Sequence, residues 1–119
     1  MNFPFEVRES KFVPGLVMLA VKVAKVTWVG PVETRVSQKT GETFKTVQVN
    51  LQITVPGASH NVYLHANAMY GDAQAVEDGQ VKTGDMVTCL VDLDTHSWNG
   101  RTYQDVTVRE METVQVVGN

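Results

Sequence analysis

The chain has little cysteine and little positive charge, and each shortage excludes a class of function. Cys89 is the only cysteine, so neither an intramolecular disulfide nor a zinc site built on several thiolates is available. It lies in an apolar run, and we expect it to be a buried thiol. Ten lysines and arginines stand against thirteen aspartates and glutamates, giving a formal net charge of -3. This balance argues against binding duplex DNA by bulk positive charge, and any nucleic-acid site must be local.

The chain also lacks a long hydrophobic run. The apolar stretch 12–20 is broken by Pro14 and Gly15 and is too short to span a membrane. Residues 1–8 lack the basic region, apolar core and small-residue cleavage site of an export signal. We therefore expect a cytoplasmic protein that does not associate with a membrane.

Valine and threonine dominate, and long segments with an apolar period of 3.6 residues are absent, which favours an all-β protein. With 119 residues, of which 43% are apolar, the chain is long enough for one domain with a real core. We expect strands over 16–29, 44–55, 60–65, 84–93 and 101–117, a helix over 66–79 that ends at Gly79, and a flexible connection over 30–42.

Apolar residues change face within the first expected strand. One face holds Val17, Leu19, Val21 and Val23. Val26 and Trp28 continue on the opposite parity. Such a phase change predicts a β-bulge near 23–25, which lets a strand curl into a small closed barrel. The same parity favours Trp28 as a core residue over a ligand platform.

The expected strand 44–55 alternates between an apolar and a polar face. Its odd positions from 47 to 55 are valine, leucine and isoleucine, whereas Phe44, Gln48, Asn50 and Gln52 lie on the other face. Burying Phe44 would break this phase, so we expect its ring on the outside.

The order of three strands, one helix and two strands matches the OB-fold, a five-stranded Greek-key barrel that often binds oligonucleotides or oligosaccharides. In 60–65 we expect Tyr63 and His65 to point outward. In the closing hairpin the inward residues are predicted to be Val87, Cys89, Val91, Leu93, Val106 and Val108. We assign 16–117 to the barrel and 1–15 to an arm that packs on the barrel or on a neighbouring subunit.

Aromatic and basic residues are interleaved on the expected outer surface. The candidate aromatic residues are Trp28, Phe44, Tyr63, Trp98 and Tyr103. The candidate cations are Lys22, Lys25, Arg35, Lys39, Lys45, Arg101 and Arg109. Single-stranded nucleic acid is bound by such a mixture, because bases stack on rings for about 1–3 kcal/mol each while cations follow the phosphates. Stacking accepts any base, so little sequence preference is expected, although the amides on strand 44–55 can bond base edges.

These rings have a second interpretation. Trp98 and Tyr103 can pack against each other across the closing hairpin, as cross-strand aromatic pairs often do. Each cation taken singly is most often solvated surface, and only convergence on one face would indicate a site.

Enzymatic patterns are poor. His60, His65 and His96 lie in different segments without the spacing of a helical metal site. Asp92 and Asp94 share one face of a strand, and a solvated face explains them more simply than a carboxylate pair or a cation site. We expect no catalysis, no metal and no cofactor. A small β-barrel hydrolase that uses Asp92, Asp94 or the pair His60 and His65 is a further hypothesis, and it would require metal-dependent activity.

The segment Val81-Lys82-Thr83-Gly84-Asp85 enters one strand, and Trp98-Asn99-Gly100-Arg101-Thr102-Tyr103 reverses it as a hairpin. Together with Asn61-Val62-Tyr63-Leu64 and the alanine-rich segment after it, this order resembles the closing part of bacterial and phage single-stranded DNA-binding proteins. The resemblance implies an OB-fold, coating of single-stranded DNA during replication, recombination or DNA transfer, and assembly into homodimers or homotetramers. By matched position it implies that Trp28, Phe44, Tyr63 and Trp98 stack on bases.

The chain departs from that family in two respects. It ends at Asn119 without the acidic tail that recruits partner enzymes, and its basic residues are sparse. A small phage or plasmid type of member fits better than a housekeeping one. RNA binding stays open. The rival hypothesis is an OB module that serves as an accessory subunit and uses its aromatic face to bind protein.

Overall fold

The computed structural model of the chain describes residues 4–114, apart from the side chains of His96 and Trp98. In this part it has seven strands and one helix, which run in the order β1 (Phe5–Glu9), β2 (Val17–Val29), β3 (Glu33–Val36), β4 (Thr43–Ile53), β5 (Val62–Met69), α1 (Gly71–Glu77), β6 (Met86–Trp98) and β7 (Arg101–Thr113).

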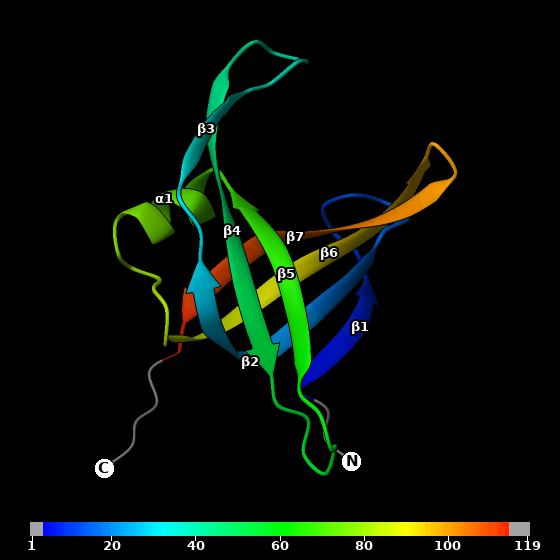
Figure 1. The fold of residues 1–119 in the computed structure, drawn as a ribbon, viewed down its shortest axis with the longest axis vertical. Helices are drawn as coiled ribbons and strands as arrows, with labels where there is room; N and C mark the ends of the chain where they lie inside the picture. The colour runs from blue at the N-terminus through cyan, green and yellow to red at the C-terminus, as the bar shows by residue number, and fades with distance from the viewer. Residues whose placement is uncertain (1–3, 115–119) are drawn as a thin grey trace.

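Five of these strands close into a barrel (Figure 1). β2 pairs antiparallel with both β4 and β6, β4 with β5, and β6 with β7. The barrel closes where β5 runs parallel to β7, through the pairs Asn67 with Thr107 and Ala68 with Val108. This connectivity, with α1 between the third and fourth barrel strands, is the expected Greek-key OB-fold, and the predicted all-β class is confirmed.

The core is formed by inward side chains from all five barrel strands. In β4 the predicted alternation is confirmed, because Val47, Val49, Leu51 and Ile53 are buried. Cys89 is buried with them, and this burial, with a smaller contribution from the charge of Asp72, raises the pKa of its thiol to about 12. The expected structural thiol is therefore confirmed.

β2 contains two bulges. Its register with β6 shifts between Val21 and Ala24, which overlaps the bulge predicted near 23–25. A second shift, against β4, lies between Val26 and Trp28. Val26 is buried, but the extra residue turns Trp28 to the outer face, where it is 45% exposed. The prediction of Trp28 as a core residue was wrong for this reason.

Residues 30–42 are not simply a connection. β3 lies within them and forms an antiparallel hairpin with the start of β4, pairing Glu33 with Thr46 and Arg35 with Phe44. The turn is closed by the amides of Ser37 and Gly41, which donate to the carbonyl oxygens of Glu42 and Ser37 respectively. All four residues of β3 are exposed, so no apolar alternation marked it as a strand.

The helix α1 begins later than the expected helix over 66–79. β5 continues to Met69, with Ala66 and Ala68 buried as inward strand residues, and α1 is only seven residues long. Gly79, with φ of 78°, ends it as predicted. The predicted helix over 66–69 was wrong because alanines at alternate positions fit the barrel interior.

β1 belongs to the expected arm 1–15 and packs on the barrel, whereas residues 1–3 of that arm lie outside the described part of the chain. β1 pairs antiparallel with β2, with Val7 opposite Leu19, and Phe5 packs against the core. Two hairpins, β3 with β4 and β6 with β7, extend beyond the barrel (Figure 1). Among the described helical residues there is no segment long and apolar enough to cross a membrane.

Candidate nucleic-acid interface

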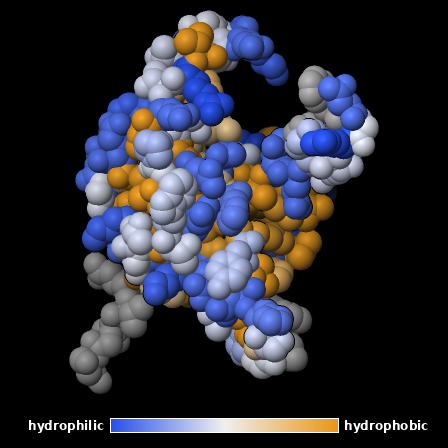
Figure 2. Space-filling view, viewed as in Figure 1, coloured by the Kyte–Doolittle hydropathy of each residue, from blue (hydrophilic) through white to orange (hydrophobic). Residues whose placement is uncertain are grey.

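The outer side of β2, β4 and β5 carries the three amides of strand 44–55 together with Trp28, Tyr63 and Lys25. Residues paired across neighbouring strands share a face. The register therefore places Lys25, Gln52 and Tyr63 in one row, Trp28, Asn50 and His65 in the next, and Gln48 and Asn67 in a third. We call this surface the amide face. In Figure 2, which looks onto β4 and β5, the centre is mostly blue and white, and two projections extend from it.

Trp28 has a fixed position at the edge of the amide face. Its Cη2 lies so close to Gly30 that a Cβ built there would be 2.9 Å away, and Cζ3 would be 3.2 Å away. The indole thus packs over the backbone of Gly30 while nearly half of the residue stays exposed. A ring supported on one side and exposed on the other is suited to stacking with a planar ligand.

Phe44 stacks on Tyr70, a residue that the sequence analysis missed. The ring centroids are 5.2 Å apart and the planes are inclined by 26°. Tyr70 is 65% exposed and connects β5 to α1 with φ of 55° and ψ of -122°, which a non-glycine residue adopts only at a cost. Tyr70 was missed because it lies inside the expected helix 66–79. The sequence Tyr-Gly-Asp, which is typical of a junction between a strand and a helix, was the signal that could have indicated its exposed position.

The cations near this surface differ in what they contact. Lys25 is exposed on the amide face. Arg35 lies beside Phe44 and forms a 3.3 Å ion pair with Glu33. Lys45 instead binds α1, donating to Gln74 Oε1 at 3.0 Å and pairing with Glu77. Lys39 is exposed in the turn between β3 and β4. Of these four, Lys25 and Lys39 are exposed to a bound nucleic-acid strand, Arg35 would contact it in competition with Glu33, and Lys45 is engaged with α1.

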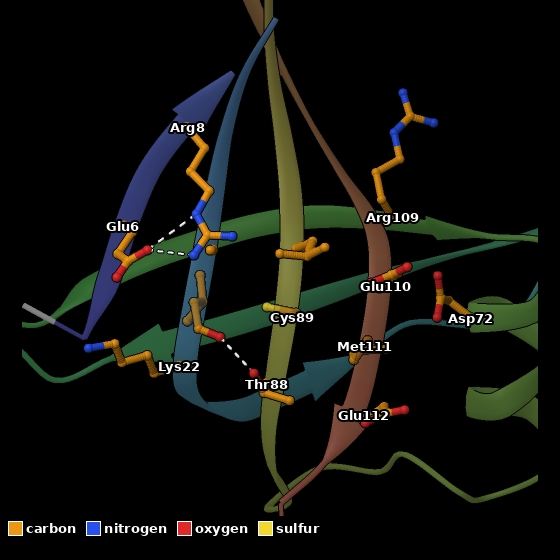
Figure 3. Close-up of a pocket in the computed structure, with 13 residues that line it drawn as sticks. Glu6, Arg8, Lys22, Asp72, Thr88, Cys89, Arg109, Glu110, Met111 and Glu112 are labelled. Carbon is orange, nitrogen blue, oxygen red and sulfur yellow. Dashed lines mark hydrogen bonds and ion pairs between the residues drawn. The ribbon is translucent and has the colours of Figure 1, made fainter. Parts of the chain in front are cut away.

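Lys22 and Arg109 lie elsewhere, on a groove over β1, β2, β6 and β7 (Figure 3). The groove has a volume of about 650 Å³. Its charge is mixed, since Glu6 pairs with Arg8 and Glu110 lies on β7 beside Arg109. The Arg8 guanidinium lowers the pKa of the Glu6 carboxyl. The convergence of all the cations on one face, which the sequence argument required, therefore does not occur.

Arg109 is engaged with a buried carboxylate. Its Nε donates to Asp92 Oδ2 at 2.8 Å, and Asp92 is only 1% exposed. The prediction that Asp92 lies on a solvated face was wrong. Val91 pairs with Val108 and Leu90 with Glu110, so Arg109 is the extra residue of a β-bulge.

Asp72, at the first turn of α1, also lines the groove. Burial, reinforced by the charge of Glu110, raises the pKa of its carboxyl to about 6, against a hydrogen bond with the backbone of Met111 that lowers it. This titrating group belongs to the groove and not to the amide face.

The β6–β7 hairpin turns at Asn99 and Gly100, whose φ values of 52° and 74° confirm the predicted Asn-Gly turn. Arg101 and Tyr103 are exposed near its tip. The side chain of Trp98 lies outside the described part of the structure. Its stacking on bases and its pairing with Tyr103 therefore both stay predictions.

No family model matches the sequence, and no curated protein matches it.

Proposed function

We propose that this protein binds single-stranded DNA with little overall sequence preference and coats exposed strands during replication, recombination or DNA transfer. The observation that carries the proposal is the amide face, where the supported indole of Trp28 and the exposed ring of Tyr63 lie in adjacent rows with Lys25. The Phe44–Tyr70 stack extends the same series of rings toward the β3–β4 hairpin.

The chemistry of the amide face suits bases better than phosphates. Rings offer stacking area, and carboxamides both donate and accept hydrogen bonds. Few cations lie on this face, so phosphate contacts are few and the salt dependence of binding is expected to be shallow for a single copy. RNA offers similar stacking surfaces, with uracil in place of thymine, and comparison with an RNA strand of matching sequence separates the two ligands.

We propose in addition that copies of the chain assemble into homodimers or homotetramers through β1. This strand is at one end of the strand order. An antiparallel pairing of two copies centred on Val7 would place Glu6 of one opposite Arg8 of the other, so the edge is complementary in charge to itself. Light scattering coupled to size exclusion tests this assembly.

The rival function, a protein-binding accessory subunit, has one observation in its favour. Apolar side chains are exposed around β1 and the loop after it, namely Val7 at 67%, Val17 at 46%, Phe12 at 39% and Val13 at 37%. Such a group of exposed apolar side chains is typical of a protein interface.

The decisive experiment is titration with a fluorescently labelled oligo-dT at low and high salt, with a duplex of equal length as control. The proposal requires quenching of tryptophan fluorescence by the single strand and weaker binding of the duplex. Replacing Lys25 by Gln should make the slope of log K against log salt shallower by about 0.7, the value for one single-strand phosphate contact. Lys82→Gln, an exposed change beside Asp85, is the matched control. Absence of binding even at low salt would leave the accessory-subunit function as the better one.

A further inference from the structure

A small depression adjoins the amide face on the side of β3. It has a volume of about 200 Å³, and Trp28 forms one wall. Glu33 and Arg35 line it from β3, and Gln48 and Asn67 line it from β4 and β5. We call it the Trp28 pocket. The OB-fold does not require these groups, and neither does base stacking. We therefore consider which ligand the pocket could bind.

The charges of the pocket disfavour a phosphate. Glu33 would repel it, and the nearby guanidinium of Arg35 is already 3.3 Å from the Glu33 carboxylate. The lining thus consists of an aromatic wall, two carboxamides and the Glu33–Arg35 ion pair, whose charges largely offset each other. An uncharged planar group with hydrogen-bonding edges, such as a nucleobase, fits this set.

The amides are partly oriented. Gln48 Nε2 donates to Asn50 Oδ1 at 3.1 Å, a contact that turns the amino end of Gln48 toward Asn50 and its Oε1 acceptor the other way. Asn67 is the cross-strand partner of Gln48. The carboxylate of Glu33 can only accept. The oxygens of Gln48 and Glu33 can together accept from an exocyclic amino group, which offers two N–H donors and is present in cytosine, adenine and guanine, whereas thymine and uracil offer a single ring N–H on that edge.

We propose that the Trp28 pocket holds one base of the bound strand, stacked on Trp28, and that it favours a base with an exocyclic amino group, such as cytosine or adenine, over thymine or uracil. This inference rests on the proposed single-strand binding. It adds to it a compositional preference that stacking by itself does not produce.

The test compares labelled oligo-dC with oligo-dU, each about 15 nucleotides long so that one OB-fold is covered. Cytosine and uracil have the same ring size and differ at the edge that the pocket contacts, so stacking is nearly matched. At pH 8 and fixed salt, fluorescence anisotropy should give an affinity for dC at least about fivefold higher, the lower end of what one good amide–base pair discriminates.

Three variants test whether the Trp28 pocket causes the preference for cytosine over uracil. Gln48→Leu and Glu33→Gln, both at exposed positions, should each reduce the dC-to-dU affinity ratio toward one. Gln52→Leu removes an amide of the same face outside the pocket and should preserve the ratio, whatever it does to affinity. Equal affinity for dC and dU, or a ratio that the pocket variants leave unchanged, would overturn the inference while leaving single-strand binding intact. Failure to bind either oligonucleotide would instead remove the proposed function and the inference with it.

Discussion

Arg109 is the partner of Asp92, and the two residues meet across a β-bulge between β6 and β7. The 2.8 Å hydrogen bond from Arg109 Nε reaches a carboxylate that has almost no exposure, and Asp92 Oδ1 has no hydrogen-bond partner among the described residues. Arg109 therefore neutralises a buried charge, whether or not it also contacts a phosphate.

Replacing Arg109 by Met is expected to destabilise the protein by about 3–5 kcal/mol, because the buried Asp92 charge then has no counterion. Urea unfolding measures the free energy. The double variant Arg109→Met with Asp92→Leu should recover most of the loss, since an apolar pair of similar volume is often as stable as a buried ion pair. A stable single variant with weakened DNA binding would show instead that Arg109 acts mainly on the phosphates.

Gly30→Ala is expected to displace the indole of Trp28, because the added Cβ would lie 2.9 Å from the ring. If Trp28 stacks on a base, affinity for oligo-dT falls by an amount approaching that of Trp28→Ala, about 1–3 kcal/mol. Tryptophan emission of the free protein should shift as well. Gly71→Ala, where a Cβ would meet nothing within 4 Å, serves as the control. Unchanged affinity in Gly30→Ala, alongside a loss in Trp28→Ala, would mean that the orientation of the ring is unimportant.

Substitution of Phe44 or Tyr70 by Ala is expected to weaken single-strand binding by about 1–3 kcal/mol each. Tyr70 offers a separate test of strain, since its φ of 55° is easily adopted by glycine. Tyr70→Gly should be more stable than Tyr70→Ala in thermal unfolding and equally impaired in binding. If both variants bind as the parent does, the exposed stack has a purely structural role.

The raised pKa of Asp72 predicts a defined pH dependence of stability. The folded state holds the proton more tightly than the unfolded chain, with a pKa of about 6 against 3.8. The stabilising contribution is thus complete below about pH 3.8 and is lost as the pH rises through about 6. Asp72→Asn should be more stable than the parent at pH 7, and the difference should shrink toward pH 4. Urea unfolding across this range measures it, with Glu112→Gln as a charge-matched control. A difference that does not vary with pH would contradict the assignment.

The sequence was sufficient to predict those parts of the fold in which apolar and polar residues alternate or a characteristic turn sequence occurs. The barrel strands, the bulge after Val21 and the Asn99–Gly100 turn all follow from local periodicity or turn chemistry. β3 was missed because every residue in it is exposed. The helix was started too early because Ala66 and Ala68 are compatible with both a helix and a crowded strand interior.

The candidate site was harder to predict, because small register changes decide which side a ring or a charge faces. One extra residue after Val26 moves Trp28 from the interior to the amide face. One extra residue at Arg109 brings its side chain to Asp92, seventeen positions earlier in the chain. Neither insertion leaves a pattern in the sequence, and the contact of Lys45 with α1 depends on a helix position that was also misjudged.

The parallel pairing of β5 with β7, called the seam below, affects the order in which the parts of the barrel fold. Its two residue pairs join segments about forty positions apart, whereas the flanking hairpins are local, so sealing of the interior is expected late in folding. Asn67 belongs both to this seam and to the Trp28 pocket. The other pocket residues lie on β2, β3, β4 and the β2–β3 connection, and Asn67 is already aligned with Gln48 by the antiparallel β4–β5 ladder, so the pocket can assemble before β5 meets β7.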